Sequence, residues 1–153
     1  MSHPEEKLTE LGLKLPEVAK PVAAYVPVVR TGNLVYTSGQ LPLRDGSLIA
    51  TGKNGDSISA EVGVECAQQC ALNALAAVKS EIGDLANVKR IVKVVAFVAS
   101  SPDFTGQPQV ANGASELLSQ VFGAAGQHAR SAVGVPVLPL DAPVEVEIIV
   151  EVA

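Results

Sequence analysis

The sequence predicts an α+β fold in which one mixed β-sheet carries two helices packed on a single face. Hydrophobic residues make up 48% of the 153 residues and aromatic residues only 3%, so the core must be aliphatic and rich in β-branched residues that favour strands. Strand-like runs precede, separate and follow two stretches with helical periodicity. The length suits one domain with a sizeable core and is too short for two.

The chain is expected to begin with a polar, partly helical lead at 1–20, ahead of a single domain at 21–153. Within this lead, EEKLTELG can form two helical turns that end near Gly12. Pro16 and Pro21 bracket the connector that follows.

A β-hairpin is expected next, because two apolar runs flank Arg30-Thr31-Gly32-Asn33 and Gly-Asn pairs favour tight turns. Pro27 lies in the first run and indicates an edge strand or a bulge. The Gly-, Asp- and Asn-rich stretch 43–56 is a predicted loop with a short strand near 47–50.

The first long helix is predicted from Ser57 or Ser59, either of which can cap it, to Gly83. Cys66 and Cys70 lie one turn apart on this helix. Their spacing matches neither a redox motif nor a zinc site, so we expect two small buried residues in a reducing compartment. Apolar residues recur at helical spacing: Val64, Ala67, Ala71, Leu75, Val78 and Ile82.

The remaining elements are a strand at 88–99, a second helix and two closing strands at about 130–135 and 144–151. Ser101-Pro102 could start the second helix, but Gly106 and Pro108 favour a start nearer Gln109, with an end at Phe122. Two helices leave one face of the sheet bare, so we expect an oligomer.

The net charge of −5, from 11 basic and 16 acidic residues, argues against a nucleic-acid partner. The sequence contains no apolar run of membrane-spanning length, and its start has the pattern of neither a secretory signal nor a transit peptide. We therefore expect a cytoplasmic protein without a membrane partner.

Three charged residues stand in segments that otherwise resemble buried strand: Arg130, Glu145 and Glu147. A guanidinium fits a carboxylate with two hydrogen bonds, so Arg130 either binds an acidic ligand or forms a structural ion pair with one of the glutamates. Residues two apart in a strand share a face, so both glutamates face either solvent or a cleft. In a cleft, desolvation raises a carboxyl pKa and a nearby arginine lowers it.

Five further residues are candidates for a pocket wall. Tyr25 and Ser38 stand in predicted apolar strands and need hydrogen bonds, in a pocket or in the core. Asn112 heads a helical stretch and could equally be a cap, whereas Gly39 allows close approach of the backbone to a ligand. His128 is more typical of a surface or supporting group than of a catalyst. The sequence offers no metal-ligand cluster and no phosphate-binding loop.

Three motifs in order resemble the Rid family, the RidA-type (YjgF-like) enamine/imine deaminases long described as translation inhibitors or L-PSP endoribonucleases. They are Y-T-S-G-Q-L-P at 36–42, N-G-A-S-E-L-L at 112–118, and the closing R-S-A-V-G-V, L-P and V-E-V-E. The resemblance runs from about residue 21 to 151. The long lead and the TGQPQ insertion at 105–109 depart from the shorter deaminases, which suggests a less characterised branch.

The resemblance implies a chorismate-mutase-like fold that closes into a homotrimer with ligand pockets between adjacent subunits. It also implies that Arg130 binds the substrate carboxylate and that Glu145 handles the attacking water. Ala132 stands where the family often has cysteine, so only its backbone carbonyl can contribute. Other pocket-lining positions of the family are matched by Tyr25, Ser38 and Asn112.

Two functions follow from this resemblance. One is a deaminase that hydrolyses 2-enamino or 2-imino acids to 2-oxo acids and ammonia, which needs no cofactor because the imine carbon is already electrophilic. The other is a non-catalytic trimer that senses small 2-oxo acids or related carboxylates in the same clefts. An endoribonuclease is disfavoured by the acidic charge and by the lack of a histidine pair.

Overall fold

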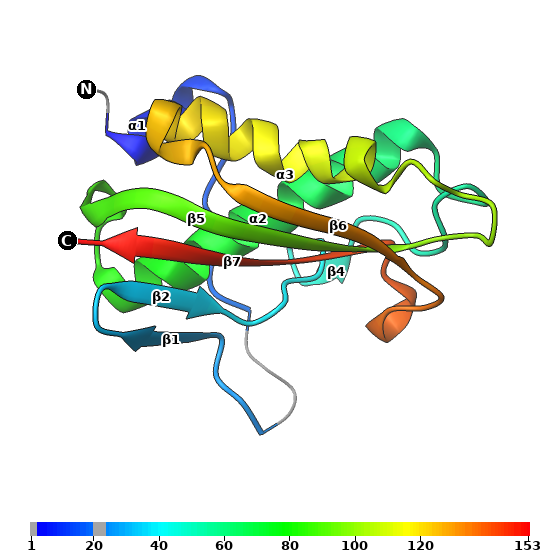
Figure 1. Ribbon diagram of the computed structural model, residues 1–153, viewed down its shortest axis with the longest axis horizontal. Coiled ribbons are helices and arrows are strands. Elements are labelled where there is room, and N and C mark those ends of the chain that lie inside the picture. Colours follow the sequence, from blue (N-terminus) through cyan, green and yellow to red (C-terminus); the bar gives the residue numbers. More distant parts are fainter. Residues whose placement is uncertain (1–2, 20–23) are drawn as a thin grey trace.

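The structure, a computed structural model, describes residues 3–19 and 24–153. Its long elements follow the predicted order, the short helix predicted in the N-terminal lead is present, and further short elements lie in the loops (Figure 1). The elements are α1 (Pro4–Glu10), β1 (Val28–Thr31), β2 (Leu34–Thr37), β3 (Leu43–Arg44), β4 (Ser47–Leu48), α2 (Ala60–Ile82), β5 (Val88–Ala99), α3 (Gln107–Phe122), β6 (Ala129–Val135) and β7 (Val144–Val152), with 3₁₀ turns η1 (Leu85–Asn87), η2 (Gly123–Gly126) and η3 (Pro139–Asp141).

The main sheet has five strands in the order β1-β2-β7-β5-β6. β5 and β6 are parallel, whereas the other neighbours are antiparallel, so the predicted mixed sheet is confirmed. β3 and β4 form a separate small hairpin, which extends the single short strand predicted near 47–50.

The predicted hairpin is confirmed as β1 and β2, with Thr31 paired to Leu34 across the turn. Gly32 has a φ of 57°, a conformation that glycine adopts without steric cost. β1 lies at the edge of the sheet, as Pro27 just before it suggested.

Both long helices begin and end at recognisable signals. The Ser59 side chain accepts a hydrogen bond from the Val62 amide and caps α2, and Gly83 ends that helix with a φ of 83°. Of the two predicted starts for α3, the later one is confirmed, because Ser101-Pro102 lies outside the helix and Gly106 stands at its N-cap.

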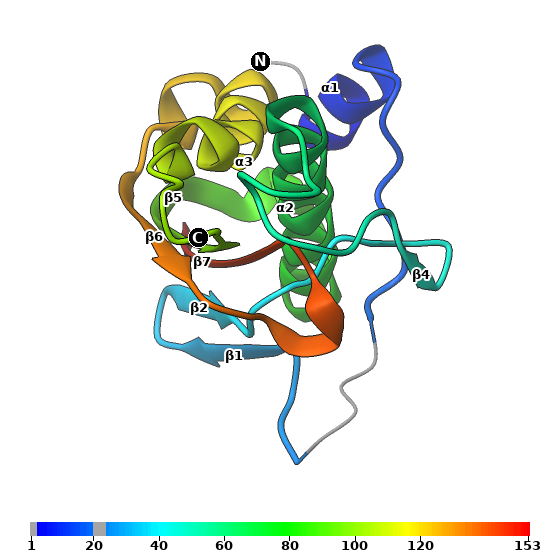
Figure 2. The same cartoon turned by 90° about the vertical axis from the view of Figure 1, so that its right-hand side faces the viewer.

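α2 and α3 lie on the same side of the main sheet (Figures 1 and 2). They approach closely at Gly113, where an added methyl carbon would lie 2.9 Å from the Val64 carbonyl carbon. Cys66 and Cys70 are fully buried and unbonded to each other, and burial raises the pKa of the Cys66 thiol to about 11. The interpretation of the cysteines as small core residues is confirmed.

The other face of the sheet has no helix over it in the part of the chain that the structure describes (Figure 2). Along β7, side chains alternate between buried and half-buried, and the half-buried set, which includes Glu145 and Glu147, faces away from the helices. Three apolar side chains on this bare face remain exposed: Val29 at 52%, Tyr36 at 40% and Val133 at 45%.

The N-terminal lead packs onto the domain through α1, which contacts α3 and η1. Leu8 of α1 is 2% exposed and belongs to the hydrophobic core. Pro21 and the predicted start of the domain lie outside the described residues. Among the described helices, none combines the length and apolarity needed to cross a bilayer.

Candidate functional site

Arg130 lies near the start of β6, the edge strand opposite β1. It pairs with the buried Val94 of β5, and paired residues share a face, so its side chain lies on the helix-covered side. Its Nη1 donates to Asn112 Oδ1 at 2.7 Å and to Ser115 Oγ at 3.1 Å. These two residues are three apart on α3 and therefore neighbours on its surface.

Both hydrogen-bond partners of Arg130 are neutral, so its positive charge is not compensated by them. The ion pairs among the described residues do not include Arg130, so the structural pair with Glu145 or Glu147 is not formed within this chain. A guanidinium carries five N–H groups, and the described residues accept only from Nη1. The N–H groups on Nε and Nη2 thus remain available, and their parallel arrangement suits a carboxylate that accepts two hydrogen bonds.

His128 continues this hydrogen-bonded group away from Arg130. Its Nε2 lies 2.9 Å from Ser115 Oγ, and its Nδ1 lies 2.7 Å from the Gly126 carbonyl oxygen. Ser115 was not predicted as a site residue. The available signal was its spacing of three from Asn112, which places both residues on the same face of a helix. The alternative that Asn112 is only a helix cap is wrong, because it lies inside α3.

A second group forms where the chain leaves β2 and runs beside β7. Gln40 exchanges backbone hydrogen bonds with Val146, of 2.8 and 3.0 Å, which holds the preceding Gly39 against Glu145. A methyl carbon added at Gly39 would overlap the carboxyl group and lie 2.8 Å from Glu145 Cδ. The backbone at Gly39 is therefore closely approached by the Glu145 carboxyl group, whereas its predicted approach to a ligand stays a prediction.

Ser38 and Tyr25 lie near this second group, but outside the strands predicted for them. Ser38 Oγ donates to the Val26 carbonyl at 2.6 Å, and its amide donates to the Pro27 carbonyl at 2.8 Å. These bonds tie the segment before β1 to the end of β2. Tyr25 directly precedes Val26 and is 52% exposed, so its side chain is open to solvent in the single chain.

The pKa of the Glu145 carboxyl is raised, first by burial and second by repulsion from the Glu147 carboxylate. Both carboxyl groups are on the bare face, and their spacing correctly predicted that they share a face. A carboxyl group with a raised pKa is a better proton acceptor and donor near neutral pH than an ordinary one. Burial and Glu147 therefore shift the Glu145 pKa in the direction that an acid–base group requires.

The two groups lie on opposite faces of the sheet. Glu145 pairs with Phe97, whereas Arg130 pairs with Val94, and residues at odd spacing in one strand point to opposite sides. β5 also separates their strands, a lateral distance of about 10 Å. Ala132 is on the same face as Arg130, half-buried against the core. Within one chain, Arg130 contacts Asn112 and Glu145 contacts Gly39, but these two groups of residues do not contact each other.

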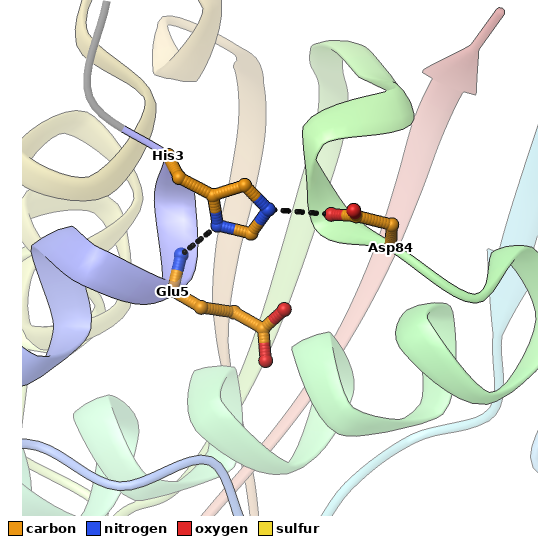
Figure 3. A group of neighbouring side chains, drawn as sticks. All are labelled: His3, Glu5 and Asp84. Atoms are coloured by element: carbon orange, nitrogen blue, oxygen red, sulfur yellow. Dashed lines mark hydrogen bonds and ion pairs between the residues drawn. The ribbon is translucent and has the colours of Figure 1, made fainter.

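A third cluster, unexpected from the sequence, joins the N-terminal lead to the end of α2 (Figure 3). His3, Glu5 and Asp84 place three possible metal-ligand atoms within 4.8 Å of one another. Each already has a partner: His3 accepts from the Glu5 amide and contacts Asp84 at 2.7 Å, and the Glu5 carboxylate pairs with Lys79. We interpret the cluster as a structural contact that holds the N-terminal lead against the end of α2. Its three residues are not among the candidate site residues. A groove of about 830 Å³ between the lead and α2 also has none of them in its wall.

Comparison with known proteins relates the whole chain to one family. Residues 5–152 match the family model described as "YjgF/chorismate_mutase-like, putative endoribonuclease". The chain is 48% identical over 145 residues to Protein TCP17 of Trypanosoma cruzi, which covers 94% of this chain and 91% of that protein. It is 30% identical over 138 residues to a 2-iminobutanoate/2-iminopropanoate deaminase of Dermatophagoides farinae, which covers 90% of this chain and 93% of that protein.

A solved structure shares the fold almost throughout. The protein Atu1372 of Agrobacterium tumefaciens, whose function is unknown, superposes with a TM-score of 0.93 at 44% identity, covering 98% of this chain and 92% of that one. The α+β architecture derived from the strand and helix pattern is therefore the one found in these relatives.

Proposed function

Because the chain belongs to the YjgF/chorismate mutase-like family, we propose that it hydrolyses reactive 2-imino acids, or their 2-enamino tautomers, to 2-oxo acids and ammonia. The relative from Dermatophagoides farinae, at 30% identity, carries this activity in its name. The reacting site would lie in clefts between the subunits of a homotrimer. The reaction needs no cofactor, since water can add directly to the electrophilic imine carbon.

The observation that carries the proposal is the uncompensated charge of Arg130. Its Nη1 is held by two neutral oxygens, on Asn112 and Ser115, so the guanidinium is fixed in place without being neutralised. A fixed fork of N–H groups at a half-buried position fits the carboxylate that every 2-imino acid carries. Arg130 would bind and orient the substrate rather than take part in bond making.

Glu145 is proposed as the acid–base group. It would accept a proton from water as the oxygen bonds to the imine carbon and pass that proton to the imine nitrogen, which becomes an amine. It would then accept the proton of the new hydroxyl group and deliver it to the amine nitrogen as the carbon–nitrogen bond breaks, so that ammonia leaves and the carbon–oxygen double bond forms. A pKa raised by burial and by Glu147 suits both transfers. The backbone carbonyl of Ala132 would help to orient the water.

A site that needs both Arg130 and Glu145 requires two chains, because within one chain they point to opposite faces of the sheet. The bare face with its exposed Val29, Tyr36 and Val133 supports association through the sheet, as a cyclic assembly buries such a face. In this arrangement Glu145 with Gly39, Ser38 and Tyr25 would come from one subunit. The neighbouring subunit would supply Arg130 with its hydrogen-bond partners. The unbonded Cys66 and Cys70 fit a cytoplasmic location.

A second candidate function is a sensor that binds small 2-oxo acids without turnover. It is favoured by Ala132, which offers no reactive side chain beside Arg130. The sensor and the enzyme differ in outcome: pyruvate would stabilise both against heat, since a ligand bound only to the folded state raises its stability, but only the enzyme would release ammonia.

The direct test supplies 2-iminopropionate, generated in situ, to the wild-type chain and to Arg130→Ala. We expect kcat/KM to fall about 100-fold, since removal of charged hydrogen bonds costs about 3 kcal/mol. Arg30→Ala, which changes an exposed arginine of β1, is the matched control and should keep the wild-type rate. Equal rates for wild type and Arg130→Ala, or no ammonia above the buffer rate, would overturn the proposed deaminase activity. If pyruvate still stabilised the protein against heat, the sensor function would remain as the explanation.

The shared site is tested by mixing subunits. Arg130→Ala and Glu145→Ala chains, co-refolded in equal amounts, should regain about a quarter of the wild-type rate, because a site is complete only when both contributing chains carry the intact residue. A site built from one chain would regain nothing. Light scattering on the wild-type protein measures the subunit number, and a monomer would contradict the trimer.

A further inference from the structure

We infer that Ser115 and His128 are positioning residues which hold the Arg130 guanidinium through one directed chain of hydrogen bonds. The chain runs from Arg130 to Ser115, from Ser115 to His128, and from His128 to the Gly126 carbonyl. The inference deepens the proposed function and rests on it for its activity readout, whereas a second readout is independent of activity.

The direction of each bond follows from which atoms can donate. The Gly126 carbonyl only accepts, so His128 Nδ1, 2.7 Å away, must carry the proton. In a neutral imidazole, Nε2 is then an acceptor, and the partner 2.9 Å from it, Ser115 Oγ–H, must donate. The lone pairs of that hydroxyl are thereby left facing Arg130 Nη1, 3.1 Å away. For the neutral imidazole, one proton arrangement satisfies the three bonds together.

The far end of the chain of bonds is anchored by the backbone. Gly126 is buried in η2, directly after α3, and a methyl carbon there would lie 2.8 Å from the Leu118 carbonyl carbon. This packing fixes the carbonyl that His128 faces. Ser115 in turn is held on α3 next to Asn112, so Arg130 Nη1 contacts two oxygens whose positions are both set by the helix. The edge of the guanidinium that carries Nε and Nη2 is therefore held in one orientation instead of changing between rotamers.

The tautomer of His128 provides a test that does not depend on activity. The chain contains two histidines, and the other, His3, accepts from the Glu5 amide through Nδ1, so in its neutral form it must carry its proton on Nε2. In alkaline buffer, a ¹H–¹⁵N correlation spectrum of the two rings should show opposite tautomers, Nδ1–H for His128 and Nε2–H for His3. A His3→Gln variant assigns the signals. An Nε2–H tautomer at His128 would overturn the inference.

The kinetic test compares Ser115→Ala with Ser115→Thr and with Ser119→Ala. Ser115→Ala removes one of the two bonds to Nη1 and should raise KM about 3- to 10-fold while kcat changes less than about twofold, because Arg130 binds the substrate carboxylate in the ground and transition states alike. Ser115→Thr keeps the hydroxyl and should restore KM. Ser119→Ala, one turn further along α3 and exposed, should leave KM and the His128 Nε2 signal unchanged.

The outcomes separate this inference from the proposed function. A wild-type protein that neither binds pyruvate nor releases ammonia overturns the function, and the tautomer still decides the hydrogen-bond chain. An active wild-type protein with unchanged KM in Ser115→Ala overturns the inference and leaves the function standing. If Ser115→Ala lowers the melting temperature and kcat while KM stays at the wild-type value, the residue is structural and the inference is also wrong.

Discussion

The contact between Gly39 and Glu145 gives the sharpest test of whether the carboxyl position matters. The φ of Gly39 lies outside the left-handed region, so alanine fits its backbone and Gly39→Ala acts only through the added methyl. That carbon would lie 2.8 Å from Glu145 Cδ, and ordinary contact begins at 3.4 Å, so the carboxyl carbon must retreat by at least the difference, about 0.6 Å. Displacements near 1 Å cost up to about 100-fold in rate, and we expect kcat/KM to fall roughly 10- to 100-fold.

The assay measures ammonia release from 2-iminopropionate alongside urea unfolding of the same samples. The unfolding free energy should change by less than about 1 kcal/mol, because the obstacle is the end of a flexible side chain. In a Glu145→Ala background the methyl has nothing to displace, so Gly39→Ala should cause no further loss of the residual rate. Full activity of Gly39→Ala, or an equal loss in both backgrounds, would refute the reasoning.

Three further outcomes follow from the geometry. Glu147→Gln removes the second cause of the raised Glu145 pKa, so the acid limb of kcat/KM against pH should move to lower pH; an unmoved limb would contradict this. A carboxyl group whose pKa is raised by folding contributes stability that is fully present below its unfolded pKa and is lost as the pH rises through its folded pKa. Glu145→Gln should therefore raise the urea midpoint more at neutral pH than in acid; an equal effect at both pH values would be evidence against it. Gly113→Ala would press on the Val64 backbone at 2.9 Å and should cost about 2 kcal/mol of unfolding free energy; Ser119→Ala on the exposed side of α3 should change it by less than about 0.5 kcal/mol.

Local signals were sufficient for most of the fold. Ser59 and Gly83 mark the ends of α2 because capping depends on neighbouring residues alone. The start of α3 was ambiguous because Ser101-Pro102 is a good local cap. In the structure the Ser101 amide instead donates to the Asn54 carbonyl, 3.0 Å away in the loop before α2, and such a long-range bond has no local signature.

The candidate site was predictable where it depended on strand periodicity and not where it depended on tertiary neighbours. The period of two placed Glu145 and Glu147 on one face correctly. Ser115 was missed because nothing in the sequence states that α3 lies over β6. Tyr25 and Ser38 were assigned to strands, but the pairing of β1 with β2 stops short of both, since Pro27 lacks an amide donor and Gln40 pairs instead with Val146 of β7.

The separation of Arg130 from Glu145 keeps the two charged groups from neutralising each other within one chain. If they faced each other in one chain, the guanidinium would lower the pKa of the carboxyl group, and the carboxylate would occupy the N–H groups that a ligand needs. On opposite faces, Glu145 keeps a raised pKa and Arg130 keeps its charge uncompensated. In the proposed trimer the substrate carboxylate would neutralise Arg130 of one subunit while its imine carbon approaches Glu145 of the next. Within a single chain, therefore, the guanidinium and the carboxyl group do not neutralise each other, and the proposed site would be complete only where two subunits meet.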